Sequence, residues 1–215
     1  MRLKVCGMTM IDQILALESM GIDFTGLIFY PRSPRYVLKA GLTAEKIKRE
    51  RLQINKVGVF VNEPEEELLR IVDEWRLDMV QLHGDESPRY CERISNHVNT
   101  IKAFRIGKDE NVAYKVHPYA DAVDMYLFDT LGVQFGGTGE QFDWQLLQDA
   151  KLRKPYFLSG GIGISDAPKA IALSKVEQYL FALDVNSKFE VSPGVKDMNL
   201  IKDFLSHLKS KENGS

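Results

Sequence analysis

The chain opens with Met1-Arg2-Leu3-Lys4-Val5-Cys6-Gly7-Met8-Thr9, and this stretch decides between the two folds that the rest of the sequence allows. Short apolar runs that alternate with longer segments of helical period are typical of parallel strands joined by crossover helices. A doubly wound open sheet usually follows its first strand with a glycine-rich turn, either GxGxxG or a phosphate-binding loop. Here the first run ends in Cys6-Gly7-Met8-Thr9, so a closed barrel is favoured.

The same alternation continues to the end of the chain. Strands are predicted near Leu3–Met8, Phe24–Tyr30, Asn55–Val61, Met79–His83, Thr100–Arg105, Val123–Thr130, Pro155–Gly160 and Gln178–Val185. Helices are predicted near Ile11–Met20, Ala44–Arg51, Glu65–Glu74, Pro88–Ile94, Asn111–Val116, Trp144–Ala150, Pro168–Leu173 and Leu200–Leu208. Eight βα units predict an α/β fold, a single-domain (β/α)₈ TIM barrel with eight parallel strands over residues 1–209 and a polar tail over 210–215. No sequence motif is expected to recur from unit to unit.

Composition excludes several classes of function. The formal net charge is −2 and the pI is about 6.1, so the surface offers a nucleic acid no long-range attraction. The two cysteines, Cys6 and Cys91, are too few for a disulfide framework and lack the paired spacing of a zinc site. No stretch approaches the roughly 20 apolar residues that span a bilayer. We therefore expect a cytoplasmic protein that acts on a small molecule, as a monomer or homodimer, without nucleic-acid or membrane partners.

Polar residues gather where the predicted strands end. Ligands of such barrels bind at the C-terminal face of the strands, and the candidates there are Cys6, Arg35, Gln81, His83, Arg105, Asp129, Gly160, Gly161, Asp184, Asn186 and Ser187. Strand side chains alternate, so Lys4 and Cys6 share the face opposite Val5, and Cys6 is expected to point into the mouth. Strands one and six are three places apart in an eight-strand ring, so Cys6 and Asp129 are predicted to flank a ligand from nearly opposite sides.

The position of these residues at strand ends does not by itself show that any of them has a catalytic or binding role. A lone strand cysteine is usually a small buried hydrophobe, and a carboxylate at a strand end often caps the next helix. His83 is equally compatible with a structural role and a ligand contact, and no neighbouring Cys or His suggests a metal.

The last two βα loops are the ones that commonly bind phosphate in this fold. Gly160-Gly161 and Asn186-Ser187 occupy these loops, where glycine permits close approach of backbone N–H groups to an anion. The loop after the second strand carries Arg32 and Arg35, each directly after a proline, and position does not choose which of them faces the mouth. Gly136-Gly137-Thr138-Gly139 suggests a mobile flap ahead of Asp143, which is predicted to cap the next helix.

Taken together, these segments resemble the phosphoribosylanthranilate isomerase family. The similar segments are Lys4–Gly7, Gly26–Tyr30 continuing into Ser33–Tyr36, Val57–Asn62, Gln81–Gly84, Leu127–Thr130, Gly136–Gly139 with Phe142–Trp144, Leu158–Gly161, and Asp184-Val185 with Pro193–Asp197. Each segment is short, but their order and spacing are specific, and they span nearly the whole chain.

The resemblance implies an Amadori rearrangement without metal or organic cofactor. It implies that Asp129 is the general acid, that Cys6 is the general base and that Arg35 holds the anthranilate carboxylate. The two glycine and asparagine loops would hold the phosphate. Lys4, on the same strand face as Cys6, is expected to favour the thiolate.

The eighth loop departs from the family pattern. It contains Asn186-Ser187-Lys188 where small residues, typically Ser-Ser-Gly, are expected, and the loss of glycine puts its backbone conformation in question. Glu140-Gln141 also differs within the flap. Two alternatives stay open: a histidine-pathway aminoaldose isomerase, in which a carboxylate is expected at both catalytic positions, and a catalytically silent phosphate-binding barrel.

Overall fold

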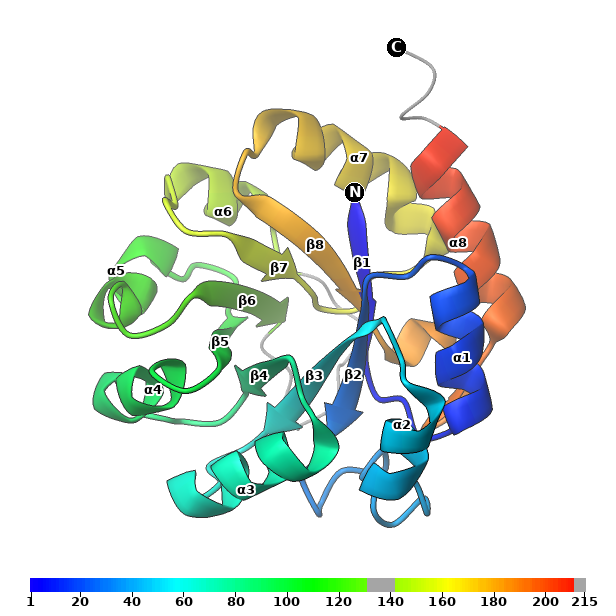
Figure 1. Ribbon diagram of the computed structural model, residues 1–215. Coiled ribbons are helices and arrows are strands. Elements are labelled where there is room, and N and C mark those ends of the chain that lie inside the picture. Colours follow the sequence, from blue (N-terminus) through cyan, green and yellow to red (C-terminus); the bar gives the residue numbers. More distant parts are fainter. Residues whose placement is uncertain (131–141, 211–215) are drawn as a thin grey trace.

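A computed structural model describes residues 1–130 and 142–210. Eight parallel strands close into a barrel in the order β1-β2-β3-β4-β5-β6-β7-β8, with the helices outside the ring (Figure 1). The strands are β1 Arg2–Val5, β2 Phe24–Ile28, β3 Asn55–Phe60, β4 Met79–Leu82, β5 Asn99–Ile106, β6 Met125–Thr130, β7 Tyr156–Leu158 and β8 Leu180–Val185. The predicted fold class is confirmed.

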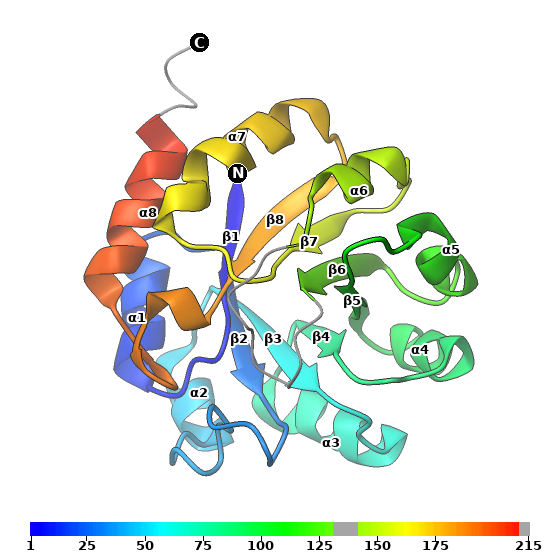
Figure 2. The same cartoon turned by 180° about the vertical axis from the view of Figure 1, so that it is seen from behind.

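Helices follow each strand, as the alternation predicted. They are α1 Ile11–Ser19, α2 Ala44–Glu50, α3 Glu65–Trp75, α4 Pro88–Ser95, α5 Val112–Val116, α6 Gln145–Asp149, α7 Ala167–Val176 and α8 Met198–Ser210, with 3₁₀ turns η1 His117–Tyr119, η2 Ile164–Asp166 and η3 Ser187–Phe189. Several begin at a capping side chain: the Thr43 hydroxyl accepts from Lys46 N–H and the Ser87 hydroxyl from Tyr90 N–H. The last helix lies beside α1 and α7 in both views (Figure 2). No helix among the described residues is long and apolar enough to cross a membrane.

Seven of the eight barrel strands are shorter than predicted, β5 is longer by one residue at each end, and two short strands were missed. The first strand ends at Val5, one residue before Cys6, although the Cys6 N–H still donates to the Val185 carbonyl at 2.9 Å. An antiparallel pair, β9 Glu190–Ser192 and β10 Val195–Lys196, follows β8. No strand was predicted there because two or three residues carry no periodicity.

The expectation that no motif recurs was wrong. Ile22-Asp23-Phe24, Leu77-Asp78-Met79 and Val123-Asp124-Met125 each enter an even-numbered strand. The Asp carboxylates of these segments accept backbone N–H groups of the preceding strand, from Leu3 at 2.9 Å, from Lys56 at 2.7 Å and from Thr100 at 2.7 Å. Three aspartates therefore fasten strands one to six in pairs at the N-terminal end of the barrel, opposite the predicted mouth.

Alternation along the strands builds a layered interior. The deeper part of the interior is an apolar cluster that consists of Phe24, Val57, Met79, Ile101, Ala103, Leu127, Phe157 and Ala182. One step nearer the C-terminal ends, the inward side chains of Lys4, Gln81 and Asp184 are polar yet buried. The interior thus changes from a packed hydrophobic floor to a polar layer, and the mouth lies directly beyond it.

Candidate active site

A cavity of about 670 Å³ opens at the C-terminal ends of the strands. Its lining includes all eleven candidates at the strand ends, namely Cys6, Arg35, Gln81, His83, Arg105, Asp129, Gly160, Gly161, Asp184, Asn186 and Ser187. Arg32 and Lys188 also line it, so both arginines of the second loop, Arg32 and Arg35, reach the mouth. The structure brings the predicted residues together, while the role of each stays a prediction.

A buried lysine forms the centre of the cavity floor. The Lys4 ammonium donates to Gln81 Oε1 at 2.8 Å and to Asp184 Oδ1 at 3.0 Å, which joins β1, β4 and β8. Burial alone would lower the pKa of Lys4, but the Asp184 carboxylate and Cys6 outweigh it and raise that pKa above 10.5. The same burial raises the pKa of Asp184, against the effect of Lys4. The ion-paired form prevails because the ammonium has two oxygen acceptors.

This contact fixes the tautomer of His83 through Gln81. An ammonium only donates, so the oxygen of Gln81 must face Lys4, and its Nε2 must donate to His83 Nδ1 at 2.7 Å. Neutral His83 therefore carries its hydrogen on Nε2, which faces Asp129 Oδ2 at 3.5 Å. The other oxygen of Asp129 accepts the Thr130 N–H at 2.8 Å. Both oxygens of the predicted acid are held in place.

Cys6 lies beside the floor and is only 5% exposed. Gly26 on β2 leaves the space that the thiol fills, since a Cβ there would lie 2.8 Å from Cys6 Sγ. Burial raises the pKa of the Cys6 thiol above 9.0, whereas the Lys4 and Lys196 ammonium groups act in the opposite direction. The expected influence of Lys4 on Cys6 is thus present, and a second lysine shares it.

The two loops of the predicted phosphate site are neighbours, because they follow the adjacent strands β7 and β8. Gly160 and Gly161 after β7 have φ angles of +95° and +67°, which disfavour other residues. A Cβ at Gly160 would also lie 2.4 Å from Thr130 Oγ1. In the neighbouring loop after β8, Asn186 has a φ of −147°, and neither Ser187 nor Lys188 has a positive φ. The eighth loop therefore needs no glycine, which removes the question raised by its sequence.

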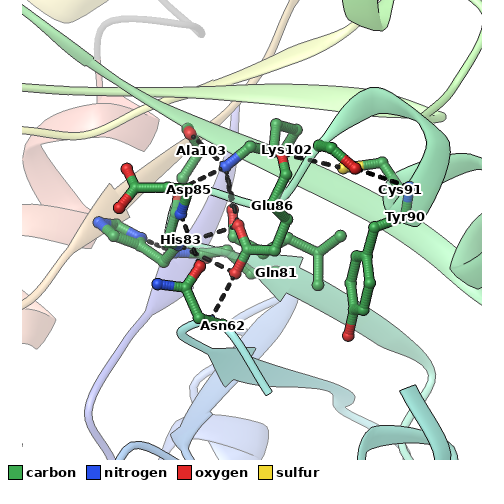
Figure 3. A network of polar contacts seen from close by, with 12 residues as sticks. Asn62, Gln81, His83, Asp85, Glu86, Tyr90, Cys91, Lys102 and Ala103 are labelled. Carbon is green, nitrogen blue, oxygen red and sulfur yellow. Dashed lines mark hydrogen bonds and ion pairs between the residues drawn. The ribbon is translucent and has the colours of Figure 1, made fainter. Parts of the chain in front are cut away.

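The loop that carries His83 is fixed by a buried ion pair that the sequence predictions missed (Figure 3). The Lys102 ammonium contacts Glu86 Oε2 at 2.9 Å and the carbonyls of Leu82 at 3.2 Å and Gly84 at 2.8 Å. Glu86 in turn accepts the Asn62 and Gly84 N–H groups. The available signal was Lys102 itself, a charged residue within the apolar run Ile101–Phe104.

Arg35 does not reach the cavity as an unpaired cation. Its Nε lies 2.9 Å from Glu190 Oε1, and its Nη2 lies 2.5 Å from Glu190 Oε2. Glu190 Oε1 also accepts from Lys196 Nζ at 2.6 Å. Neither Glu190 nor Lys196 was predicted as a site residue, because both belong to the missed pair β9–β10.

Two further predictions meet different outcomes. The helix begins at Gln145, one residue later than predicted, and Trp144 instead of Asp143 is its N-cap, without a capping side chain. Asp143 precedes the cap, and its Oδ1 accepts the Gln145 N–H at 3.0 Å, so the predicted N-cap position was wrong. The glycine-rich segment 136–139 and Glu140-Gln141 lie outside the described residues. Within residues 1–130 and 142–210, no group of three or more His, Cys, Asp or Glu side chains is arranged to hold a metal ion.

The fold and this cavity define a (β/α)₈ barrel with a thiol, a carboxyl group and two glycine- or asparagine-containing loops at one mouth. The family model of N-(5'-phosphoribosyl)anthranilate isomerase matches residues 3–207. The chain belongs to this family.

Named relatives and solved structures agree. The isomerase of Parabacteroides distasonis is 38% identical over 97% of this chain and 93% of its own length, and that of Pseudomonas syringae pv. tomato is 39% identical over 95% and 96%. The crystal structure of the Thermotoga maritima enzyme aligns with a TM-score of 0.84, 33% identity and coverage of 97% and 98%. A phosphoribosyl anthranilate isomerase solved with reduced 1-(o-carboxyphenylamino)-1-deoxyribulose 5-phosphate aligns with a TM-score of 0.80 and 32% identity, over 97% of this chain and 98% of its own.

Proposed function

We propose that this protein isomerises N-(5-phosphoribosyl)anthranilate to 1-(2-carboxyphenylamino)-1-deoxyribulose 5-phosphate, a step of tryptophan biosynthesis. One observation carries the proposal: a family member places a thiol and a carboxyl group in the same cavity as two loops suited to phosphate and an arginine suited to a carboxylate. The related structure with the reduced product analogue supports the ligand class.

The reaction needs one proton donated and one removed. Asp129 protonates the furanose ring oxygen as the C1–O bond breaks, and the nitrogen lone pair forms the Schiff base. The Cys6 thiolate then removes the C2 proton, and the released electron pair gives the enolamine, which tautomerises to the ketone. No electrons enter or leave, so the rearrangement requires no redox cofactor.

The surrounding groups suit these two roles. His83 and the Thr130 N–H orient the Asp129 carboxyl group, while Lys4 and Lys196 favour the Cys6 thiolate against the effect of burial. Gln81, His83 and Asp184 would contact the ribose from the floor, and Arg35 would receive the anthranilate carboxylate.

Phosphate binding is assigned to the last two loops. Gly160 and Gly161 in one loop and Asn186 and Ser187 in the adjacent loop would donate backbone N–H groups, with Lys188 as a nearby cation. The thiol base must stay reduced, so the enzyme would work in the cytoplasm.

A fluorescence assay that follows consumption of freshly generated phosphoribosylanthranilate tests the proposal. We expect turnover that is unchanged by a chelator. Tight binding without turnover would instead indicate a silent phosphate-binding barrel. Preference for an aminoaldose of histidine biosynthesis would indicate the other alternative, although Cys6 stands where that chemistry calls for a carboxylate.

A further inference from the structure

Glu190 pairs with Arg35 but does not line the cavity. Arg35 lines the cavity, but Glu190 and Lys196 do not. The side chains of Arg35, Glu190 and Lys196 are 14%, 4% and 0% exposed, respectively. A group in this position contacts no substrate, so any effect on substrate recognition must pass through Arg35.

The acceptors of Glu190 are fully used. Oε1 accepts from Arg35 Nε at 2.9 Å, Gly194 N–H at 3.1 Å and Lys196 Nζ at 2.6 Å, and Oε2 accepts from Arg35 Nε at 3.0 Å and Nη2 at 2.5 Å. These cationic and backbone donors hold the pKa of Glu190 below 4.5, despite its burial. The carboxylate is thus ionised and fixed at neutral pH.

The donors of Arg35 are only half used. A guanidinium has five N–H donors and two faces for a carboxylate, a side face formed by Nε and Nη2 and an end face formed by Nη1 and Nη2. Glu190 occupies the side face. Within the described part of the chain, Nη1 makes no hydrogen bond. The two cations and one carboxylate also leave a net charge of +1 beside the cavity.

We propose that Glu190 is a positioning residue for substrate selectivity, which locks the side face of Arg35 so that the end face receives the anthranilate carboxylate. This inference rests on the proposed function. A substrate carboxylate that displaced Glu190 would leave a buried carboxylate with a single cation, Lys196, which is costly. Substrate and Glu190 therefore bind different faces of one guanidinium.

Removal of the Glu190 charge distinguishes two roles of Glu190, namely holding Arg35 in a fixed orientation and lowering the positive charge beside the cavity. Without a positioning role, Glu190→Gln would make the region more positive and lower KM for the carboxylate-bearing substrate. With a positioning role, Arg35 loses its fixed orientation and that KM rises, by about tenfold on the scale of one charge-assisted hydrogen bond. The two interpretations predict opposite signs.

The experiment measures kcat/KM for phosphoribosylanthranilate and for its analogue made with aniline, which lacks the carboxylate. We expect Glu190→Gln to lower the ratio of the two values about tenfold, mainly through KM. Any effect on Cys6 through Lys196 acts on both substrates and cancels in the ratio. Arg35→Lys, which keeps the charge but cannot present two faces, should lower the ratio similarly and provides a second route if Glu190→Gln folds poorly. Glu65→Gln, which removes an exposed partner of Arg93, is the matched control.

A double variant shows whether Glu190 acts through Arg35. In an Arg35→Ala background, Glu190→Gln should leave the ratio unchanged. An unchanged or increased ratio in the single variant, or an equal further loss in the double variant, would overturn the inference. If the wild type does not turn over phosphoribosylanthranilate, the proposed function fails separately. Calorimetric binding of the reduced product analogue, with and without its carboxylate, then tests Glu190 alone.

Discussion

At Cys6, burial and the neighbouring positive charges have opposite effects on the pKa of the thiol. Burial raises its thiol pKa, and two ammonium groups, each balanced by its own carboxylate, lower it. The sequence placed Lys4 on the same strand face as Cys6, because alternation alone determines that relation. Lys196 could not be predicted near Cys6, since 190 residues separate them and the missed β9–β10 pair carries the lysine.

Loss of either reacting group should abolish most turnover. We expect Cys6→Ser and Asp129→Asn each to lower kcat by roughly 10²- to 10⁴-fold, the usual contribution of a positioned acid or base. Thermal unfolding should change little, because both residues line the cavity. Cys91→Ala, at a buried thiol remote from the mouth, controls for the loss of a thiol. Near wild-type kcat in either variant would rule out the assigned roles.

The ionisation of Cys6 can be measured directly. The ultraviolet absorbance of the thiolate, taken as the difference between wild type and Cys6→Ser, should rise with a midpoint above that of an ordinary exposed thiol, because burial raises the pKa. Lys196→Met removes a positive charge that favours the thiolate, so the transition should move to higher pH. The second thiol, Cys91, has its pKa raised by burial to about 11 and is subtracted in the difference. A shift to lower pH in Lys196→Met would contradict the electrostatic assignment.

At the scale of elements, the β4–α4 loop depends on one buried ion pair. Lys102→Met would leave Glu86 charged and buried without its cation, and we expect a loss of about 3–5 kcal/mol of unfolding free energy. Arg93→Ala, which breaks an exposed pair with Glu65, should cost no more than about 1 kcal/mol. Urea unfolding measures both variants. Equal small losses would mean that the Lys102 pair does not hold the loop.

The loop after β7 depends on a glycine for two reasons that can be separated. Gly160→Ala introduces both a strained φ of +95° and a clash with Thr130, whereas Gly41→Ala introduces only a strained φ of +78° with nothing within 4 Å. We expect Gly41→Ala to lower the free energy of unfolding by about 1–2 kcal/mol through backbone strain alone. Gly160→Ala should lower it by roughly a further 1–3 kcal/mol because of the clash with Thr130. Only Gly160→Ala should weaken binding of inorganic phosphate. Equal phosphate affinities in the two variants would argue against the assigned phosphate loop.

Helices and strands could be predicted from the sequence where the spacing of apolar residues was regular. Each predicted strand and helix exists, with ends displaced by a few residues, because hydrogen bonds to neighbouring strands set the ends and leave little trace in composition. The aspartates before β2, β4 and β6 were overlooked, because single carboxylates before strands resemble ordinary turn residues.

At the scale of the whole molecule, the barrel should unfold as one unit. Its two tryptophans, Trp75 and Trp144, are both buried and lie in opposite halves of the chain. Single-tryptophan variants, Trp75→Phe and Trp144→Phe, should each give one fluorescence transition that coincides with the circular dichroism transition of the same variant. Separate midpoints for the two probes would indicate that the halves unfold independently.

The position of Lys4 and Asp184 also bears on how the chain completes its fold. They are register partners where the first and the last strand meet, and their ion pair crosses that seam. Before β8 arrives, the ammonium inside a growing sheet has lost much of its water without gaining its carboxylate. An open or partly wound assembly is therefore penalised, and arrival of the final strand removes the penalty. The Lys4–Asp184 pair in the cavity floor therefore stabilises the closed barrel relative to assemblies in which β1 and β8 have not yet paired.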